Sequence, residues 1–161
     1  MRSILRVISM GGTALALSVG ATGCDTAPRV RGYSEAYLAQ AQAITREVPG
    51  DYFVGRRYYN PYFKFWGYVR QPGQSWKTAR LVMLNENQKL APDREANNFG
   101  VDDNAEYHLH GRFTGEKVYE PTSNRLYPEF LLAGYELVNR SPASIFPPGG
   151  RLPDTVIKQP Y

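Results

Sequence analysis

The sequence contains little of what metal and disulfide chemistry need. Its 161 residues include a single cysteine, Cys24, so an intramolecular disulfide and a cysteine-based metal cluster are excluded. Only two histidines are present, His108 and His110. The chain also lacks a run of about 20 consecutive apolar residues, the length that a membrane-spanning helix requires.

Common catalytic motifs are missing as well. The sequence contains no Walker phosphate loop, no G-x-G-x-x-G, no G-x-S-x-G and no H-E-x-x-H. Strong charge of one sign is also absent, with 19 basic against 15 acidic residues. If Arg2 and Arg6 were removed with a leader, 17 basic residues would face the same 15 acidic ones, a net charge of +2. This near balance argues against nucleic acid as a partner.

The N-terminus has the features of a targeting segment. Arg2 and Arg6 precede an uncharged stretch of apolar and small residues at positions 7–20. The stretch ends in Ala21-Thr22-Gly23-Cys24, which resembles the lipobox of bacterial lipoproteins, although Ala21 stands where leucine is commonest. The resemblance covers residues 1–24. The alternative is an ordinary signal peptide that is cut elsewhere, with a chance cysteine.

The lipobox resemblance implies how the mature protein is held. Residues 1–23 would be removed, and Cys24 would become an acylated N-terminus that carries palmitate or a similar chain. Two or more acyl chains suffice for stable membrane anchoring. The resemblance therefore implies a protein of the bacterial cell envelope, anchored to a membrane by lipid and facing the periplasm.

The mature chain divides into four segments by composition. Residues 24–33 have no periodicity and suit a tether. Ser34 is a suitable N-cap for a helix within 34–49 that stops at Pro49-Gly50. Residues 51–140 carry strand signals, and the proline-rich residues 141–161 are predicted to lie outside the folded domain. The alternative for this tail is that its apolar residues lie back across the β domain, namely Ile145, Phe146, Leu152, Val156 and Ile157.

Strand signals dominate the β domain. β-Branched and aromatic runs predict strands near 52–59, 62–70, 77–86, 106–113, 117–120 and 130–138. In the run 106–113, Tyr107 and Leu109 alternate with polar residues, so one face should be buried. Hairpin turns are predicted at 71–74 and at Thr114-Gly115, and a long loop at 87–104.

These elements predict a mainly β fold. We expect a small antiparallel, partly open barrel of five to six strands, preceded by one short helix. The order of elements is similar to that of OB-fold barrels. OB folds usually carry a helix between their third and fourth strands, whereas the sequence predicts a loop there.

Three groups of residues could carry chemistry. Glu106, His108 and His110 share one face of a strand and could bind Zn or Fe, although a solvated strand face is the more ordinary explanation of this alternation. An aromatic and basic block could stack on bases, sugars or lipid, or could simply fill the core; its candidate ligand-binding residues are Arg56, Arg57, Trp66, Tyr68 and Arg70. An acidic set in or beside the long loop could bind a cation or hydrolyse glycans, or could form turns: Glu86, Asp93, Asp102 and Asp103.

The sequence favours a non-enzymatic function without a cofactor. A lipid-tethered small β domain would bind or scaffold another component of the envelope, namely a protein. One alternative is a metal-assisted hydrolase that uses Glu106, His108 and His110. A second alternative is a barrel that binds sugar or single-stranded nucleic acid around Trp66.

Overall fold

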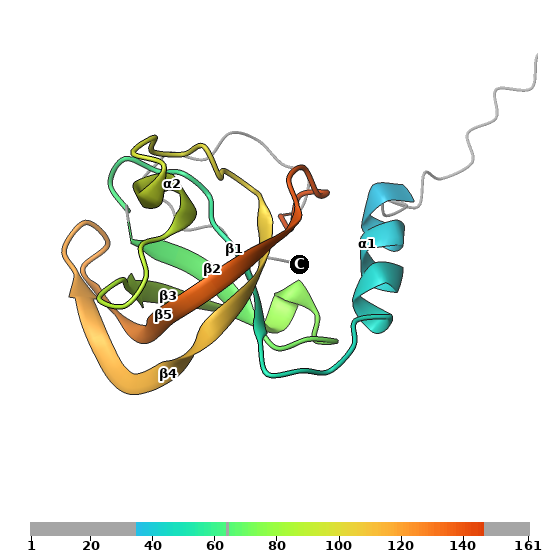
Figure 1. The fold of residues 1–161 in the computed structure, drawn as a ribbon, viewed down its shortest axis with the longest axis horizontal. Helices are drawn as coiled ribbons and strands as arrows, with labels where there is room; N and C mark the ends of the chain where they lie inside the picture. The colour runs from blue at the N-terminus through green and yellow to red at the C-terminus, as the bar shows by residue number, and fades with distance from the viewer. Residues whose placement is uncertain (1–34, 64, 147–161) are drawn as a thin grey trace, which may run out of the picture. The chain divides into compact units, whose positions relative to one another are not determined.

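The structure is a computed structural model that describes residues 35–63 and 65–146. Five strands and three short helical elements make up this part of the chain (Figure 1). The strands are β1 (Phe53–Arg56), β2 (Trp66–Arg70), β3 (Arg80–Asn85), β4 (Glu106–Glu120) and β5 (Arg125–Asn139). The helical elements are α1 (Glu35–Thr45), the 3-10 helix η1 (Trp76–Thr78) and α2 (Pro92–Glu95). Within the described ranges, none of the helices has the length and hydrophobicity needed to cross a membrane.

The five strands form a closed barrel in the order β1-β2-β3-β5-β4. The predicted small barrel with one preceding helix is confirmed, but it is closed where a partly open barrel was expected. Closure occurs because the first part of β4 pairs with both β5 and β1. All neighbouring strands are antiparallel except β3 and β5, which run parallel. The short helix α2 lies between the third and fourth strands, which brings the fold closer to the OB-fold arrangement than the sequence indicated.

β4 is one long strand where two were predicted. The expected hairpin at Thr114-Gly115 is wrong, since β4 continues through these residues and only shifts its register against β5 between Phe113 and Lys117. A second shift occurs at Gly111, where an added Cβ would lie 2.1 Å from the carbonyl oxygen of Leu131. Such bulges bend a strand. The bends allow β4 to contact β1 at its start and to extend along β5 to its end.

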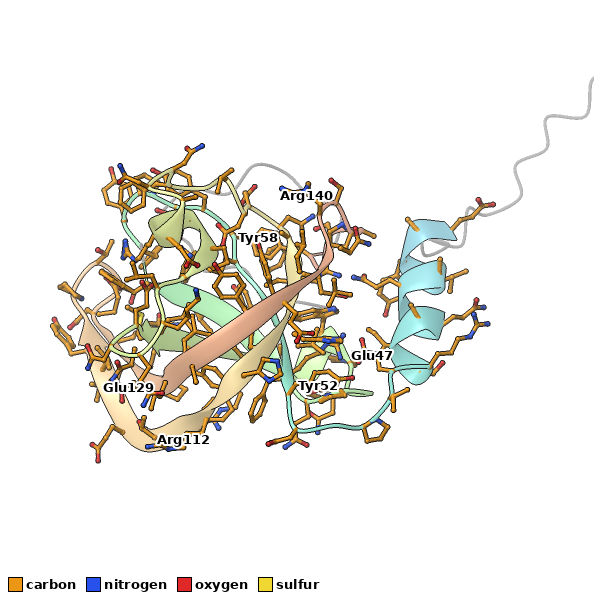
Figure 2. The ribbon with its side chains drawn as sticks, in the orientation of Figure 1. Glu47, Tyr52, Tyr58, Arg112, Glu129 and Arg140 are labelled. Carbon is orange, nitrogen blue, oxygen red and sulfur yellow. The ribbon has the colours of Figure 1, made fainter. Side chains whose placement is uncertain are left out.

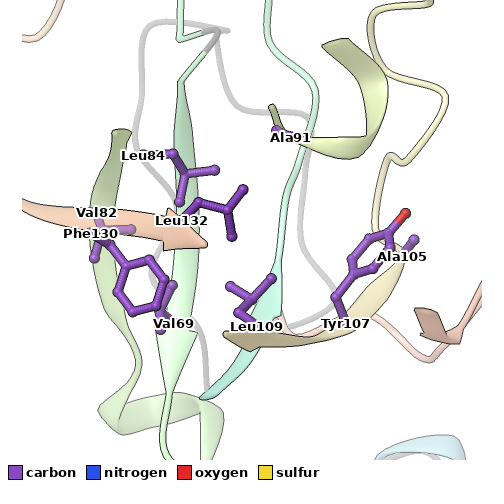
Figure 3. Close-up of a cluster of buried hydrophobic side chains, with 9 residues drawn as sticks. All are labelled: Val69, Val82, Leu84, Ala91, Ala105, Tyr107, Leu109, Phe130 and Leu132. Atoms are coloured by element: carbon purple, nitrogen blue, oxygen red, sulfur yellow. The ribbon is translucent and has the colours of Figure 1, made fainter. Parts of the chain in front are cut away.

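The main core lies inside the barrel. The alternation predicted for β4 is confirmed, because Tyr107 and Leu109 are buried and their polar neighbours are not. They pack with side chains from β2, β3 and β5, from the residue before α2 and from the residue before β4 (Figure 3), namely Val69, Val82, Leu84, Phe130, Leu132, Ala91 and Ala105. Burial of these apolar side chains stabilises the barrel even though several of its strands are short.

A second hydrophobic cluster covers the outer side of β1 and β2. Val54 and Tyr68 from these strands pack with Trp76 of η1 and with Ile145, which is 1% exposed. Ile44 of α1 and Phe146 pack against the same cluster. Ile145 and Phe146 thus pack against the barrel, although they lie beyond residue 140, where the sequence predicts the β domain to end. Of the tail residues considered above, Ile145 and Phe146 do lie back on the barrel, and the other three lie outside the described residues.

Candidate binding groove

A groove runs over the outside of β3. Its volume is about 630 Å³, which lies within the range of small-molecule and peptide sites. We call it the β3 groove; its walls come from the start of β2, the end of β3, the loop that follows it, α2 and the β4–β5 hairpin. The lining residues are Phe65, Met83, Leu84, Asn85, Glu86, Asn87, Leu90, Arg94, Val118 and Glu129.

The pleat of β3 directs side chains into the groove. Leu84 points into the barrel core, so its neighbours Met83 and Asn85 face the outer side. The parallel pairing with β5 places Met83 opposite Glu129. Asn85 Nδ2 donates a hydrogen bond of 3.0 Å to Glu129 Oε1, which fixes the position of this carboxylate. In Figure 2, Glu129 lies at the end of β5 that is far from Arg140.

Arg94 of α2 forms one wall of the groove. Its guanidinium carbon lies 3.7 Å from the centre of the Phe65 ring and 5.5 Å from that of Phe99. Its Nε lies 2.9 Å from the Glu86 carboxylate, and both side chains of this ion pair are largely buried. Stacking of a guanidinium on an aromatic face is favourable. The Arg94 side chain is thus held by contacts on two sides, and its charge is balanced by Glu86.

The groove combines exposed apolar side chains with one unbalanced charge. Phe65 and Leu90 are 45% and 48% exposed. Glu86 is neutralised by Arg94, whereas Glu129 has no cation within ion-pair distance in the described part of the chain. The lining residues include no serine, cysteine or histidine that could act as a nucleophile or base. The combination of exposed apolar side chains and one carboxylate suits the binding of a partner.

The residues predicted to bind ligand through stacking are all in the interior. Arg56, Arg57, Trp66, Tyr68 and Arg70 are each at most 8% exposed. The three arginines pair with acidic side chains of this chain, respectively Glu106, Asp93 and Glu47. Trp66 Nε1 donates to the carbonyl oxygen of Tyr58 at 2.9 Å. The prediction of a stacking surface there is corrected, since rings covered on both sides cannot present a face to a base or a sugar.

The three residues predicted to bind metal do not converge. Glu106 accepts hydrogen bonds from Arg56, and the ring of His108 lies 4.1 Å from that of Tyr52. His110 Nε2 lies 3.6 Å from a carboxylate oxygen of Glu136. Among the residues that the structure describes, no group of three potential metal-binding side chains is present. Glu106 and His108 are thus in contact with other side chains, whereas His110 is about half exposed beside Glu136.

The acidic set attaches the 86–104 loop to the barrel. The carboxylates of Asp93 and Asp102 both lie at the guanidinium of Arg57, Asp102 at 3.5 Å. Burial raises the pKa of Asp102 to about 6, although Arg57 opposes this effect. Asp103 accepts a hydrogen bond of 2.6 Å from the backbone N–H of Tyr59. With Glu86 paired to Arg94, all four residues have structural roles, which agrees with the turn interpretation more than with a cation site.

The β3 groove was not found by sequence reasoning. Of its lining residues, Glu86 belongs to the acidic set described above, whereas Phe65, Leu90, Arg94 and Glu129 belong to none of the predicted sites. No local pattern marks them, because Met83 and Glu129 meet only through the parallel pairing of β3 with β5. Comparison with known proteins does not identify the groove either, because no protein-family profile, curated protein or solved structure matches this chain significantly.

Proposed function

We propose that this protein is a lipid-tethered, non-enzymatic binding module of the bacterial cell envelope, which holds another envelope protein in the β3 groove. The observation that carries the proposal is the groove itself, a hollow of about 630 Å³ with Phe65 and Leu90 exposed at its sides. Exposed apolar side chains that gather around a hollow are typical of interaction sites.

The charges of the groove support binding over catalysis. A general acid or base needs a titratable group that is free to exchange a proton with a substrate. Glu86 and Arg94 form an ion pair with each other. Glu129 accepts a hydrogen bond from Asn85, and the described lining places no second acid or base outside that ion pair beside it. Exposed aromatic and aliphatic side chains around a fixed arginine are also common at the centre of protein interfaces.

The tether is proposed from the N-terminal sequence. Cys24 lies outside the described residues, and the case for its acylation rests on the similarity of residues 1–24 to a lipoprotein signal. Anchoring would keep the groove near one membrane and restrict its partners to envelope components on the periplasmic side. High local concentration at that membrane would allow binding with modest intrinsic affinity.

Site-specific crosslinking in the full-length protein tests the proposal. A photoreactive amino acid replaces Leu90 in the groove, and a matched one replaces Leu137, an exposed apolar residue of β5 that does not line the groove. We expect a discrete protein adduct from position 90 and not from 137. The adduct should disappear when Phe65→Ser is added, since Phe65 is half-exposed and its loss leaves the core intact. Equal adducts from both positions, or an adduct from position 90 that survives Phe65→Ser, would overturn the proposal.

A further inference from the structure

The chemistry of the β3 groove defines its partner more closely. We infer that the groove binds an extended polypeptide segment in which apolar side chains accompany a lysine or arginine, and that this cation pairs with Glu129. The inference rests on the proposed function, because it names the class of partner that the same groove would hold.

Glu129 is the acidic position of the groove that remains unbalanced. Among the described lining residues, Glu86, Arg94 and Glu129 carry a formal charge, and the first two form an ion pair. The side chain of Glu129 is partly buried, its Oε1 is held by Asn85, and no cation of the described chain reaches it. A partly desolvated carboxylate is stabilised by a cation that arrives with a partner. The fixed geometry means that little side-chain entropy is lost when the cation binds.

The apolar lining fits side chains that accompany this cation. Met83 lies beside Glu129 through the strand register, and Val118 faces the groove from the β4–β5 hairpin. Phe65 and Leu90 supply exposed apolar surface from two other segments. Methionine adapts to side chains of different shape, so the site should accept several apolar residues. Because several segments of the chain bound the hollow beside the end of β3, an extended partner segment can direct successive side chains to different walls.

The negative charge of Glu129 argues against partners that carry phosphate groups. Nucleic acids and anionic lipid headgroups would bring negative charge to Glu129, and juxtaposed like charges are costly. Arg94 does not offset this repulsion, because Glu86 already neutralises it and the Phe65 ring covers it. The groove therefore selects a basic segment over an acidic one.

Fluorescence anisotropy with labelled peptides tests the inference on the full-length protein in a non-ionic detergent. One probe is an eight-residue peptide of alternating leucine and lysine. The control peptide has glutamate in place of each lysine. Protein-free detergent measures any binding of the peptides to micelles. We expect the lysine peptide to bind at least tenfold more tightly than the glutamate peptide, with a preference that weakens as salt is added.

Variants of Glu129 distinguish the effect of its charge on peptide binding from the effect of the shape of the groove. Glu129→Gln keeps an oxygen that can accept from Asn85 and should weaken binding of the lysine peptide about tenfold. Glu129→Lys should reverse the preference between the two peptides. The control is Glu136→Gln, which removes an exposed carboxylate on the same strand outside the groove and should change nothing.

The outcomes that contradict the inference differ from those that contradict the proposed function. If the lysine peptide does not bind, or if both peptides bind equally and Glu129→Gln has no effect, a basic segment is not the partner. The proposed function would still stand if the crosslink from position 90 forms and depends on Phe65. If the crosslink from position 90 persists in Phe65→Ser, the proposed function is contradicted, regardless of how the two peptides bind.

Discussion

Arg56 and Glu106 face each other across β1 and β4, and one carboxylate oxygen of Glu106 accepts hydrogen bonds from both Nε and Nη2 of Arg56, at 2.9 and 2.5 Å. Arg56 Nη1 also donates to the carbonyl oxygen of Ala143 at 2.6 Å. One buried guanidinium thus joins two barrel strands to the segment that follows β5. Glu106 thus supplies the acceptor for this contact with its Oε2 atom.

Removal of the Glu106 carboxylate should destabilise the fold. Glu106→Ala leaves Arg56 buried without its partner, and the free energy of unfolding should fall by about 3 kcal/mol, as is typical when one member of a buried ion pair is lost. Chemical denaturation measures this change. Glu136→Ala, at an exposed position of β5, should stay within about 0.5 kcal/mol of the wild type.

A chelator tests whether Glu106, His108 and His110 bind a metal in addition to their contacts within the protein. EDTA should leave the melting temperature of the wild-type protein unchanged, since the described contacts of Glu106, His108 and His110 are to other side chains. A clear drop with EDTA that disappears in His108→Ala would show that these residues bind a metal after all.

The buried carboxyl of Asp102 should make stability depend on pH. Burial raises its pKa to about 6 in the folded protein, from an ordinary value of 3.8. The folded state therefore retains a proton that the unfolded chain loses. The stability that this proton contributes is fully present below about pH 4 and is lost as pH rises through about 6.

Asp102→Asn should remove this part of the pH dependence. The free energy of unfolding is measured for the wild type and the variant at each pH from 4 to 7, and the two values are subtracted. The subtraction cancels the contributions of titrating groups that both proteins share. We expect the variant to gain stability relative to the wild type across this window. Asp51→Asn, at an exposed position before β1, serves as the control. Parallel curves for wild type and Asp102→Asn would show that the pKa of Asp102 is not raised.

Ile145 should contribute strongly to stability although it lies beyond the last strand. Ile145→Ala removes a side chain that is 1% exposed in the second cluster, and such a truncation costs about 2–5 kcal/mol. Val138→Ala, at an exposed position, should cost no more than about 0.5 kcal/mol. Truncation after Ser144 should therefore be destabilising, which contrasts with the sequence-based expectation of a dispensable tail. Equal stability of the Ile145→Ala variant and the wild type would contradict the described packing.

Acylation of Cys24 can be tested without reference to the groove. Metabolic labelling with a tagged fatty acid should mark the wild-type protein, and Cys24→Ala should abolish the label and release the protein from the membrane fraction. The physical reason is that the acyl chains supply the membrane affinity. An unlabelled mature wild-type protein would refute the anchor.

Local patterns were sufficient to identify most elements of the barrel. The alternation around Tyr107 and Leu109 predicted a half-buried strand, and Ser34 with Pro49 bracketed the helix that became α1. These signals depend only on residues close in sequence. They failed at Thr114-Gly115, where glycine in a left-handed conformation, with φ of 91°, serves a bulge and not a turn. A glycine has the same local signature in both settings.

Patterns of neighbouring residues were enough to predict the secondary-structure type and the approximate positions of the strands, because these depend on residues close in sequence. The tertiary structure decided which faces are buried and where a partner could bind. Arg56 and Arg70 are in the interior because η1 and Ile145 cover β1 and β2 from outside. Glu129 lines a groove because β5 runs parallel to β3. Both outcomes come from contacts between segments far apart in the chain, and the pattern of any single segment carries no information about such contacts.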